Sequence, residues 1–311
     1  MTKQNVFIAM IAVAVLFATY LAFELFPKPT TIEGDLTITH MLGDTVVKRN
    51  PTKVVVFDYG VLETLDQLEV EVIGLPKSSL PSKLSKYASS QYTDVGTLFE
   101  PNFELLYTLS PELIIISHRQ LALYDQLSEI APTIYLGMNN TSFIDSFEQN
   151  MLMLGQIFDK TEEQVALVEQ VRIEVEVVNT VASSSNLKVL VIMVNANNIS
   201  ALGVGSRFDV VHTDFGAIPA DPNIAISQHG QNVTFEYIHQ INPDILLIVD
   251  RGMIVEGGGG AAQLLDNEFI NQTKAAQTGK MIYLDAVAWY ITTGGSDSIA
   301  IMMDDLLRAF E

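Results

Sequence analysis

Apolar residues along this chain form short runs of three to six, and between the runs they recur every three or four positions. Short apolar runs bounded by turn residues indicate strands covered on both faces, as in a parallel sheet. Recurrence every three or four positions indicates helices packed on one face. We interpret these runs as strands: 36–40, 45–48, 54–57, 70–75, 113–117, 134–136, 189–194, 245–250 and 281–285. The pattern therefore predicts an α/β fold that opens with a small hairpin.

One phrase of this pattern occurs twice. Residues 111–119 read Pro-Glu-Leu-Ile-Ile-Ile-Ser-His-Arg, and residues 243–251 read Pro-Asp-Ile-Leu-Leu-Ile-Val-Asp-Arg. Each copy predicts a helix, a proline turn, a buried strand and then an arginine, Arg119 or Arg251. Ligands of open α/β sheets bind at the carboxyl ends of strands. The repeat thus predicts two lobes, each presenting a cation to a shared cleft.

A long helix is predicted between the two copies. Residues 161–182 contain no proline or glycine, begin with Thr-Glu-Glu, and place valines at 165, 168, 171, 175 and 178 on one stripe. At about 1.5 Å per residue this helix would run roughly 33 Å. Its β-branched residues lower helix propensity, so it must be packed. We expect two Rossmann-like lobes with parallel-rich sheets, at 32–160 and 186–311, joined by a backbone helix at 161–185, with further helices at 208–215, 235–240 and 299–310.

The N-terminal segment, residues 1–31, is predicted to direct the chain to a membrane. Residues 6–26 are almost continuously apolar, and residues 27–31 read as a stiff linker. This run is close to the roughly 20 residues that span a bilayer. Tyr20 and Ala22 make a poor cleavage site, so an uncleaved anchor and a cleaved export signal both stay open, with a buried helix as a third alternative. Either of the first two exports the chain from about residue 32.

Composition narrows the classes of function. The chain has 311 residues, of which 48% are hydrophobic, so two domains with real cores are possible. Its 17 Lys+Arg against 37 Asp+Glu give a net charge of -20, which argues against nucleic-acid binding. Cations are scarce, so an arginine after a hydrophobic strand is informative. The absence of cysteine excludes disulfides and thiolate metal sites.

Signatures of common enzymes are missing. There is no H-E-x-x-H or D-x-D-x-D-G pattern, and Gly203-Val204-Gly205-Ser206 misses the spacing of a serine hydrolase. Residues 257–260 are four glycines without the Lys-Ser/Thr that completes a phosphate loop, so we expect a flexible turn there. We therefore expect no catalytic residues.

The order of local phrases resembles the ferric-siderophore binders among the helical-backbone periplasmic proteins that serve ABC importers, most closely those for catecholates. The resemblance spans about residues 35–311. It rests on Phe57-Asp58-Tyr59-Gly60, residues 111–120, Gly205-Ser206-Arg207-Phe208, Ser227-Gln228-His229-Gly230-Gln231, Phe235-Glu236-Tyr237-Ile238, residues 242–252 and Trp289-Tyr290.

The resemblance implies a site. It places Arg119, Arg207 and Arg251 in the cleft as an anion-binding triangle, with His229 and Tyr290 able to bond the ferric ion of the bound siderophore. Guanidinium groups are permanently charged and stack on aromatic rings, which suits an anionic catecholate. Phenolate oxygen and imidazole nitrogen are suitable donors for ferric iron. Further residues expected to line the cleft are Tyr59, Gln120 and Asn195, although strand-end polar residues often only cap helices.

Each of these residues also has a purely structural interpretation. The arginines could form salt bridges, His229 could be a surface histidine, and Tyr290 could be a core aromatic. We expect the other histidines to be structural or solvated, and we expect His118 to point away from Arg119 if the strand continues. Those histidines are His40, His118, His212 and His239.

The function implied is capture of ferric catecholate siderophores in the periplasm and delivery to an ABC permease dimer with its ATPase. The alternative is a haem or cobalamin binder of the same fold, since a His or Tyr could serve as axial ligand. We expect no intrinsic cofactor, a monomer, membrane contact only through the N-terminal segment, and small hinge motions limited by the long helix.

Overall fold

The computed structural model describes residues 34–252 and 260–311. The expected membrane segment at 1–31 and the glycine turn at 257–260, apart from Gly260, lie outside the described residues. Within the described part, no helix combines the length and apolar character needed to cross a membrane.

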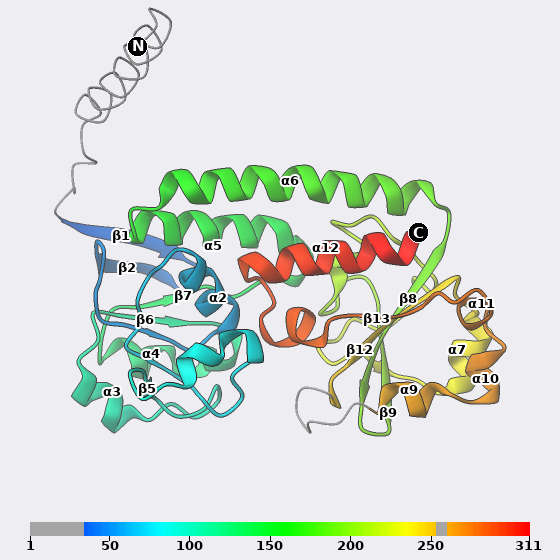
Figure 1. Ribbon diagram of the computed structural model, residues 1–311, viewed down its shortest axis with the longest axis horizontal. Coiled ribbons are helices and arrows are strands. Elements are labelled where there is room, and N and C mark those ends of the chain that lie inside the picture. The colour runs from blue at the N-terminus through cyan, green and yellow to red at the C-terminus, as the bar shows by residue number, and fades with distance from the viewer. Residues whose placement is uncertain (1–33, 253–259) are drawn as a thin grey trace, which may run out of the picture. The chain divides into compact units, whose positions relative to one another are not determined.

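The first lobe is built on a parallel sheet of five strands in the order β5-β4-β3-β6-β7 (Figure 1). Its members are β3 (Val54–Val56), β4 (Gly74–Leu75), β5 (Thr93–Asp94), β6 (Leu113–Ile116) and β7 (Thr133–Tyr135). The expected hairpin precedes it as β1 (Asp35–His40) and β2 (Gly43–Lys48), which pair antiparallel. Strand β6 is buried at every position, as its unbroken Leu-Ile-Ile-Ile run predicts.

Helix α2 of the first lobe begins at a side-chain cap that lies close to the end of a strand. The Asp58 carboxylate follows β3 and accepts from the backbone N–H groups of Gly60 and Val61 at 2.9 and 3.0 Å, which starts α2. The helical elements of this lobe are α2 (Tyr59–Gln67), η1 (Ser82–Ala88), α3 (Phe103–Leu109), η2 (His118–Leu123), α4 (Tyr124–Ser128), η3 (Asn140–Ser142) and α5 (Phe143–Ile157).

The second lobe has a mixed sheet in the order β11-β9-β8-β12-β13, with β10 pairing with β8. Strands β12, β13 and β10 run parallel to β8, whereas β9 returns antiparallel through a tight turn. The bounds are β8 (Lys188–Asn195), β9 (Asn198–Leu202), β10 (Ile218–Pro219), β11 (Gln231–Asn232), β12 (Ile245–Asp250) and β13 (Met281–Tyr283). The helical elements are η4 (Asp209–Val211), α7 (Phe235–Ile241), α9 (Ala261–Leu265), α10 (Glu268–Asn271), α11 (Lys274–Gln277), η5 (Val287–Ile291) and α12 (Ser296–Phe310). The predicted two-lobed, parallel-rich α/β class is confirmed.

The repeated phrase has the same backbone course in both lobes. Helix α3 ends at Ser110 and α7 ends at Asn242, each in the left-handed region with φ of 48° and 51°. A proline follows each of these caps, and the strand β6 or β12 begins two residues later. A left-handed cap followed by proline stops a helix sharply, so the sequence repeat reflects a real structural repeat.

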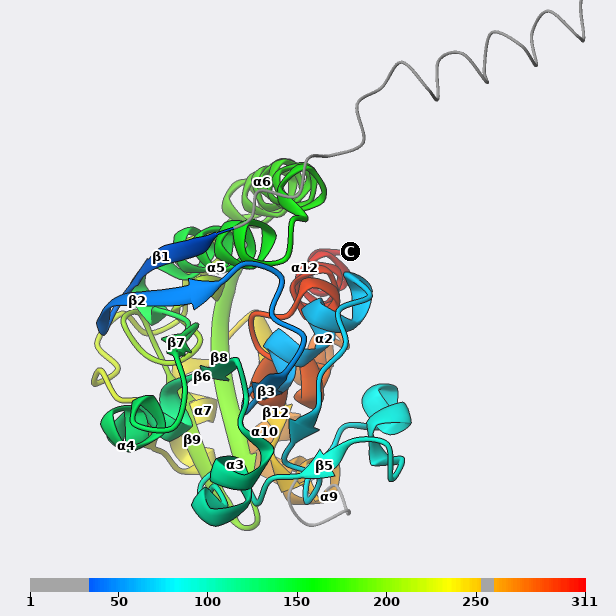
Figure 2. The same ribbon diagram turned by 90° about the vertical axis from the view of Figure 1, so that its left-hand side faces the viewer.

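Helix α6 (Thr161–Ser184) joins the lobes and lies beside α5 and α12 (Figures 1 and 2). Its buried positions include Val168, Val171 and Val178, as predicted. Val165 is 39% exposed, so its place on the buried stripe was wrong. Gln164 occupies that buried position at the start of the helix, and Ala182 extends the stripe at the end. One apolar core runs from β3 through these three helices to β12.

Residues 208–215, predicted as a helix, form only the short turn η4. The carboxylate of Asp209 accepts from the backbone N–H of Gly205 at 2.7 Å and from the Thr213 hydroxyl at 3.0 Å. These bonds fold the segment into a compact loop, which buries Val211 and Phe215 in the core without helical periodicity.

The C-terminal helix α12 contacts both α6 and the first-lobe helix α2. Glu63 on α2 is buried, and its carboxylate accepts from the backbone N–H and the hydroxyl of Ser298 at 2.7 and 3.1 Å. Lys83 forms an ion pair with the same carboxylate. A Cβ at Gly60 would lie 2.7 Å from the carbonyl oxygen of Thr292, so only glycine permits this close approach. The loop before α12 is thereby fixed to the first lobe.

Candidate functional site

A pocket of about 260 Å³ lies where the carboxyl ends of the first-lobe strands face loops of the second lobe. The first lobe contributes residues that follow β3, β6 and β7, as expected for an open α/β sheet. The lining residues are Asp58, Phe99, Ser117, His118, Arg119, Leu136, Gly137, Met138, Asn140, Phe143, Arg207, Gln228, His229, Tyr290, Ile291 and Thr293. Four residues expected in the cleft, namely Arg119, Arg207, His229 and Tyr290, are thus brought together.

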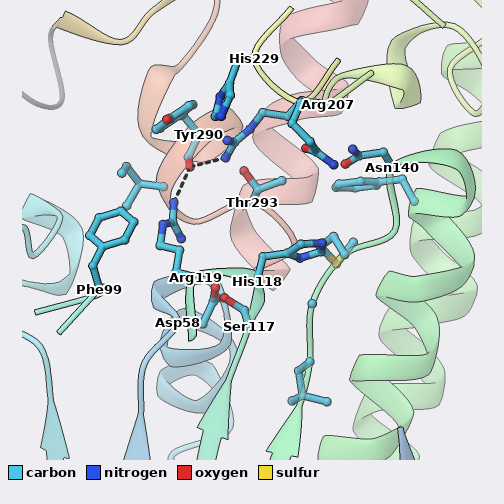
Figure 3. Close-up of a pocket in the computed structure, with 16 residues that line it drawn as sticks. Asp58, Phe99, Ser117, His118, Arg119, Asn140, Arg207, His229, Tyr290 and Thr293 are labelled. Atoms are coloured by element: carbon cyan, nitrogen blue, oxygen red, sulfur yellow. Dashed lines mark hydrogen bonds between the residues drawn. The ribbon is translucent and has the colours of Figure 1, made fainter. Parts of the chain in front are cut away.

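Two arginines from different lobes converge on one atom (Figure 3). Arg119 follows β6 on η2, and Arg207 lies on the loop after β9. Each donates from its Nη2 to the backbone carbonyl oxygen of Tyr290 at 3.1 Å. Each of these bonds engages one N–H of a guanidinium that has five, so donors remain for a bound anion.

Tyr290 is held in place by the residue before it. It lies on η5, a single π-helical turn, and such turns are frequent at functional sites. Trp289 is fully buried, donates from Nε1 to the Asp305 carboxylate at 2.9 Å, and packs edge-on against Phe208 with 5.8 Å between ring centroids. Because Phe208 and Trp289 are fixed in the core, their neighbours Arg207 and Tyr290 are directed together into the pocket.

The third arginine has a different place. The guanidinium carbon of Arg207 lies 4.0 Å from the centroid of the Tyr290 ring, and that of Arg251 lies 5.4 Å from it. Arg251 does not line the pocket. Strand β12 continues two residues further than β6 does, to Asp250, so the two arginines of the repeat are not equivalent in space. Arg251 stands against the tyrosine ring, where it stabilises the ring through cation–π attraction.

Charge is concentrated unfavourably around Arg207. Burial, together with the nearby cations Arg119 and Arg251, lowers the pKa of Arg207 to about 10. The guanidinium therefore stays charged at neutral pH, in a site where like charges and poor solvation oppose it. An anion entering the pocket would relieve this repulsion, so the site favours anionic ligands.

His229 lies on an exposed loop next to Tyr290 and Arg207 (Figure 3). The loop is positioned at its start by Ser227, whose backbone N–H donates to the buried Ser206 hydroxyl at 3.3 Å. It ends at Gly230, which has φ of 76° and packs against the carbonyl of Ala201. The imidazole is thus presented to the pocket on a short, anchored loop, where it is free to reach a ligand.

His118 lies in the pocket as well, contrary to the prediction that it would point away from Arg119. Strand β6 ends at Ile116, and η2 begins at His118, so the alternation of a strand no longer applies. Its Nδ1 lies 2.9 Å from the Tyr135 hydroxyl. Burial and the charges of Arg207 and Arg119 lower the pKa of His118, which favours the neutral imidazole.

Three other expected residues lie outside this pocket. Tyr59 is buried and donates its hydroxyl to the Pro76 carbonyl at 3.0 Å, and burial raises its pKa to about 12. Gln120 is fully buried, where it completes a capping box with Ser117 and donates to the carbonyls of Phe57 and Leu98. Asn195 ends β8 at the tight turn into β9. Tyr59 and Gln120 support the pocket wall from behind.

Several lining residues were not found from the sequence. Phe99 is 68% exposed and faces the pocket from the first lobe, and Asn140 and Thr293 complete two of its walls (Figure 3). The only signal in the sequence for Phe99 was an aromatic residue two positions before a proline, Pro101. Among the described residues, no three His, Asp or Glu side chains gather as a metal-binding cluster.

Comparison with known proteins identifies the family of the chain. A family model described as periplasmic binding protein matches residues 54–288, and the chain belongs to this family. Members of this family are binding proteins. The chain is similar to the petrobactin-binding protein YclQ of Bacillus subtilis, with 41% identity over 285 residues and 90% of each chain covered.

Two further relatives are named for siderophores. The ferric-anguibactin-binding protein FatB of Vibrio anguillarum is 35% identical over 286 residues, covering 90% of this chain and 89% of FatB. The crystal structure of the periplasmic catecholate-siderophore binding protein VctP of Vibrio cholerae is matched with a TM-score of 0.85 at 34% identity, over 88% of this chain and 100% of VctP. The crystal structure of YclQ gives a TM-score of 0.86, over 90% of this chain and 99% of that one.

Proposed function

We propose that this protein captures anionic ferric siderophores of the catecholate type outside the cytoplasmic membrane and delivers them to an ABC permease. The observation that carries the proposal is the convergence of Arg119 and Arg207, one from each lobe, on Tyr290. A catecholate that binds ferric iron has lost its phenolic protons, so its charge matches the clustered cations. YclQ, FatB and VctP, to which this chain is similar, are each named as binders of a siderophore, which supports the same ligand class.

His229 and Tyr290 complete the proposed site as iron donors. A chelate with two catechols fills four of six positions on ferric iron, which leaves two for a phenolate and an imidazole. Both side chains line the pocket, and Tyr290 is fixed while His229 lies on an exposed loop. The ferric ion is cargo in this scheme, and the protein needs no resident cofactor.

Delivery requires the remaining proposed partners. A permease dimer with its ATPase would receive the chelate, and the acidic chain, with its net charge of -20, suits docking on basic surfaces. We expect the binding protein to act as a monomer and to avoid nucleic acid. The apolar segment at 1–31 would hold it at the membrane if uncleaved, and the mass of the mature protein distinguishes an anchor from a cleaved signal.

A ligand panel tests the function. Trp289 is the single tryptophan and adjoins Tyr290, so its fluorescence should report binding. We expect quenching by ferric bis- and tris-catecholates, with little response to a ferric hydroxamate, haem or cobalamin. Tight binding of haem or cobalamin without binding of any catecholate would establish the alternative function instead.

A further inference from the structure

A second hollow, of about 650 Å³, adjoins the arginine-lined pocket. The two hollows share five lining residues, which are His118, Gly137, Met138, Asn140 and Gln228. From this shared wall the second hollow extends to the β1–β2 hairpin and along α5. One elongated ligand could therefore occupy both hollows at once.

The chemistry of the two hollows differs. The first contains Arg119, Arg207 and Asp58, whereas the lining of the second holds no Asp, Glu, Lys or Arg among the described residues. Its walls carry hydroxyls and amides together with three methionines and two histidines, His40 and His118, and burial lowers the pKa of both histidines, which favours their neutral form. In a chain with 37 acidic residues, a groove of this size without a carboxylate selects for uncharged polar groups.

Amide groups are available for a ligand in this groove. Within the described part of the chain, the side chains of Asn140, Gln149 and Gln228 form no hydrogen bond with another protein group, and each is exposed or half-buried. A primary amide both donates and accepts, which is the pattern that pairs with amides in a ligand. Asn140 lines both hollows and so stands at their junction, across the first pocket from Tyr290 (Figure 3).

The groove is also preformed. The backbone N–H of Asn139 donates to the Ser146 hydroxyl at 3.0 Å, and the Asn150 amide donates to the Leu136 carbonyl at 3.2 Å. Met138 packs against Gly294, where a Cβ would lie 2.6 Å from the sulfur. These contacts fix the loop between β7 and α5, so a ligand would not bear the cost of ordering it.

We propose that this second hollow binds the uncharged, amide-bearing linker arm of a chelate whose iron centre lies at the arginines. The inference rests on the proposed function and adds to it a basis for selectivity. The arginines recognise the charge of the iron centre, and the groove recognises the chain that carries the catechols. Extended siderophores should consequently bind more tightly than compact ones of equal charge.

Two synthetic chelates test this. One is the ferric complex of a bis-catecholamide built on lysine, and the other is the same chelate extended by a capped triglycine arm. The arm should tighten binding to the wild-type protein about tenfold, the equivalent of one or two net hydrogen bonds. The variant Gln149→Trp places a large ring in the groove. It should abolish this gain in affinity and leave the affinity for the short chelate unchanged. Gln149→Ala, a milder change, should reduce the gain about threefold.

Gln156→Trp is the matched control. Gln156 is exposed on the same helix, two turns beyond Gln149, and does not line the groove. The Gln156→Trp variant should leave the affinity for both chelates unchanged. Equal affinity of the wild type for the two chelates, or an equal loss of both in Gln149→Trp, would overturn the inference while leaving the proposed function intact. Binding of neither chelate to the wild type would overturn both.

Discussion

The guanidinium of Arg207 lies over the ring of Tyr290, with 4.0 Å between the guanidinium carbon and the ring centroid. The same arginine donates to the backbone carbonyl of Tyr290, so two independent contacts fix one residue to the other. Because Arg119 reaches that carbonyl from the first lobe, Tyr290 is the point at which both lobes meet in the pocket.

Removal of either convergent arginine should weaken binding of an anionic ferric catecholate. A charged hydrogen bond contributes about 1.5–3 kcal/mol, so Arg119→Ala and Arg207→Ala should each lower affinity roughly tenfold to a hundredfold. Arg207→Lys should lose part of the affinity, because lysine keeps the charge but not the planar stacking. Fluorescence-quench titration measures each effect. Lys53→Ala, at an exposed position before β3, is the control, and unchanged titrations for both pocket variants would refute the site.

Arg251 should matter less than the other two arginines. It contacts the ring of Tyr290 from outside the pocket, and its effect on a ligand is indirect. We expect Arg251→Gln to lower affinity about threefold, consistent with loss of one cation–π contact. A loss as large as that of Arg207→Ala would show instead that Arg251 touches the ligand.

Direct coordination of iron predicts a spectroscopic difference between ligand types. Tyr290→Phe keeps the ring and the carbonyl but removes the phenolate oxygen, and His229→Ala removes the imidazole. With a tetradentate ferric catecholate, both variants should lose the protein-derived charge-transfer absorption, whereas a hexadentate complex should change little. Equal losses for both ligand types would argue against coordination by these residues.

Asp214 should make stability depend on pH. Burial, with Asp145 and Asp209 nearby, raises its pKa from 3.8 to about 6. The folded protein therefore holds a proton that the unfolded chain releases between about pH 4 and 6, and the stability linked to this proton falls as pH rises through that window.

The neutral variant Asp214→Asn should accordingly be more stable than wild type at pH 7.5. The gain should be about 1 kcal/mol once solvent screening of this half-buried group is allowed for, and it should vanish near pH 4. Urea unfolding at the two pH values measures the difference. Asp304→Asn, on the exposed side of α12, is the control for loss of a surface carboxylate. A constant difference across pH would contradict the assignment.

Glu63 should stabilise both the fold and the pocket. Glu63→Ala leaves the Ser298 N–H without its buried acceptor and breaks the pair with Lys83, so we expect the free energy of unfolding to fall by roughly 3 kcal/mol. Ligand binding should weaken as well, because the loop before α12 is released. Glu63→Gln, which keeps an acceptor, should lose less, and Glu71→Ala at an exposed position should lose almost nothing. If the Glu63→Ala protein were destabilised but kept wild-type affinity, Glu63 would stabilise the fold without supporting the pocket.

The fold followed from the sequence because its signals are local. Apolar runs, proline turns and the valine stripe each report on a few neighbouring residues, and most of the elements formed where expected. The segment at 208–215 did not, because the carboxylate of Asp209 bonds to the loop around it, and side-chain bonds of this kind leave no periodic pattern.

Placement of site residues was harder to predict because it depends on where strands end. Two additional residues in β12 separate Arg251 from the position of Arg119, although the two phrases look alike. Tyr59 and Tyr290 were both expected in the cleft. Tyr290 lines the pocket, whereas Tyr59 is buried and its hydroxyl donates to the Pro76 carbonyl inside the core. His118 came into the pocket because the strand stopped two residues before it.

The packing of α12 on α2 and α6 also sets the order in which the protein is assembled. Residues 296–310 follow Tyr290 and both sheets along the chain, and the bonds from Ser298 to Glu63 that fix the Tyr290 loop form only after this helix has been synthesised. A nascent chain can present the first-lobe half of the pocket but not the tyrosine that joins the two halves. The complete pocket thus forms only once α12 has packed against α2 and α6.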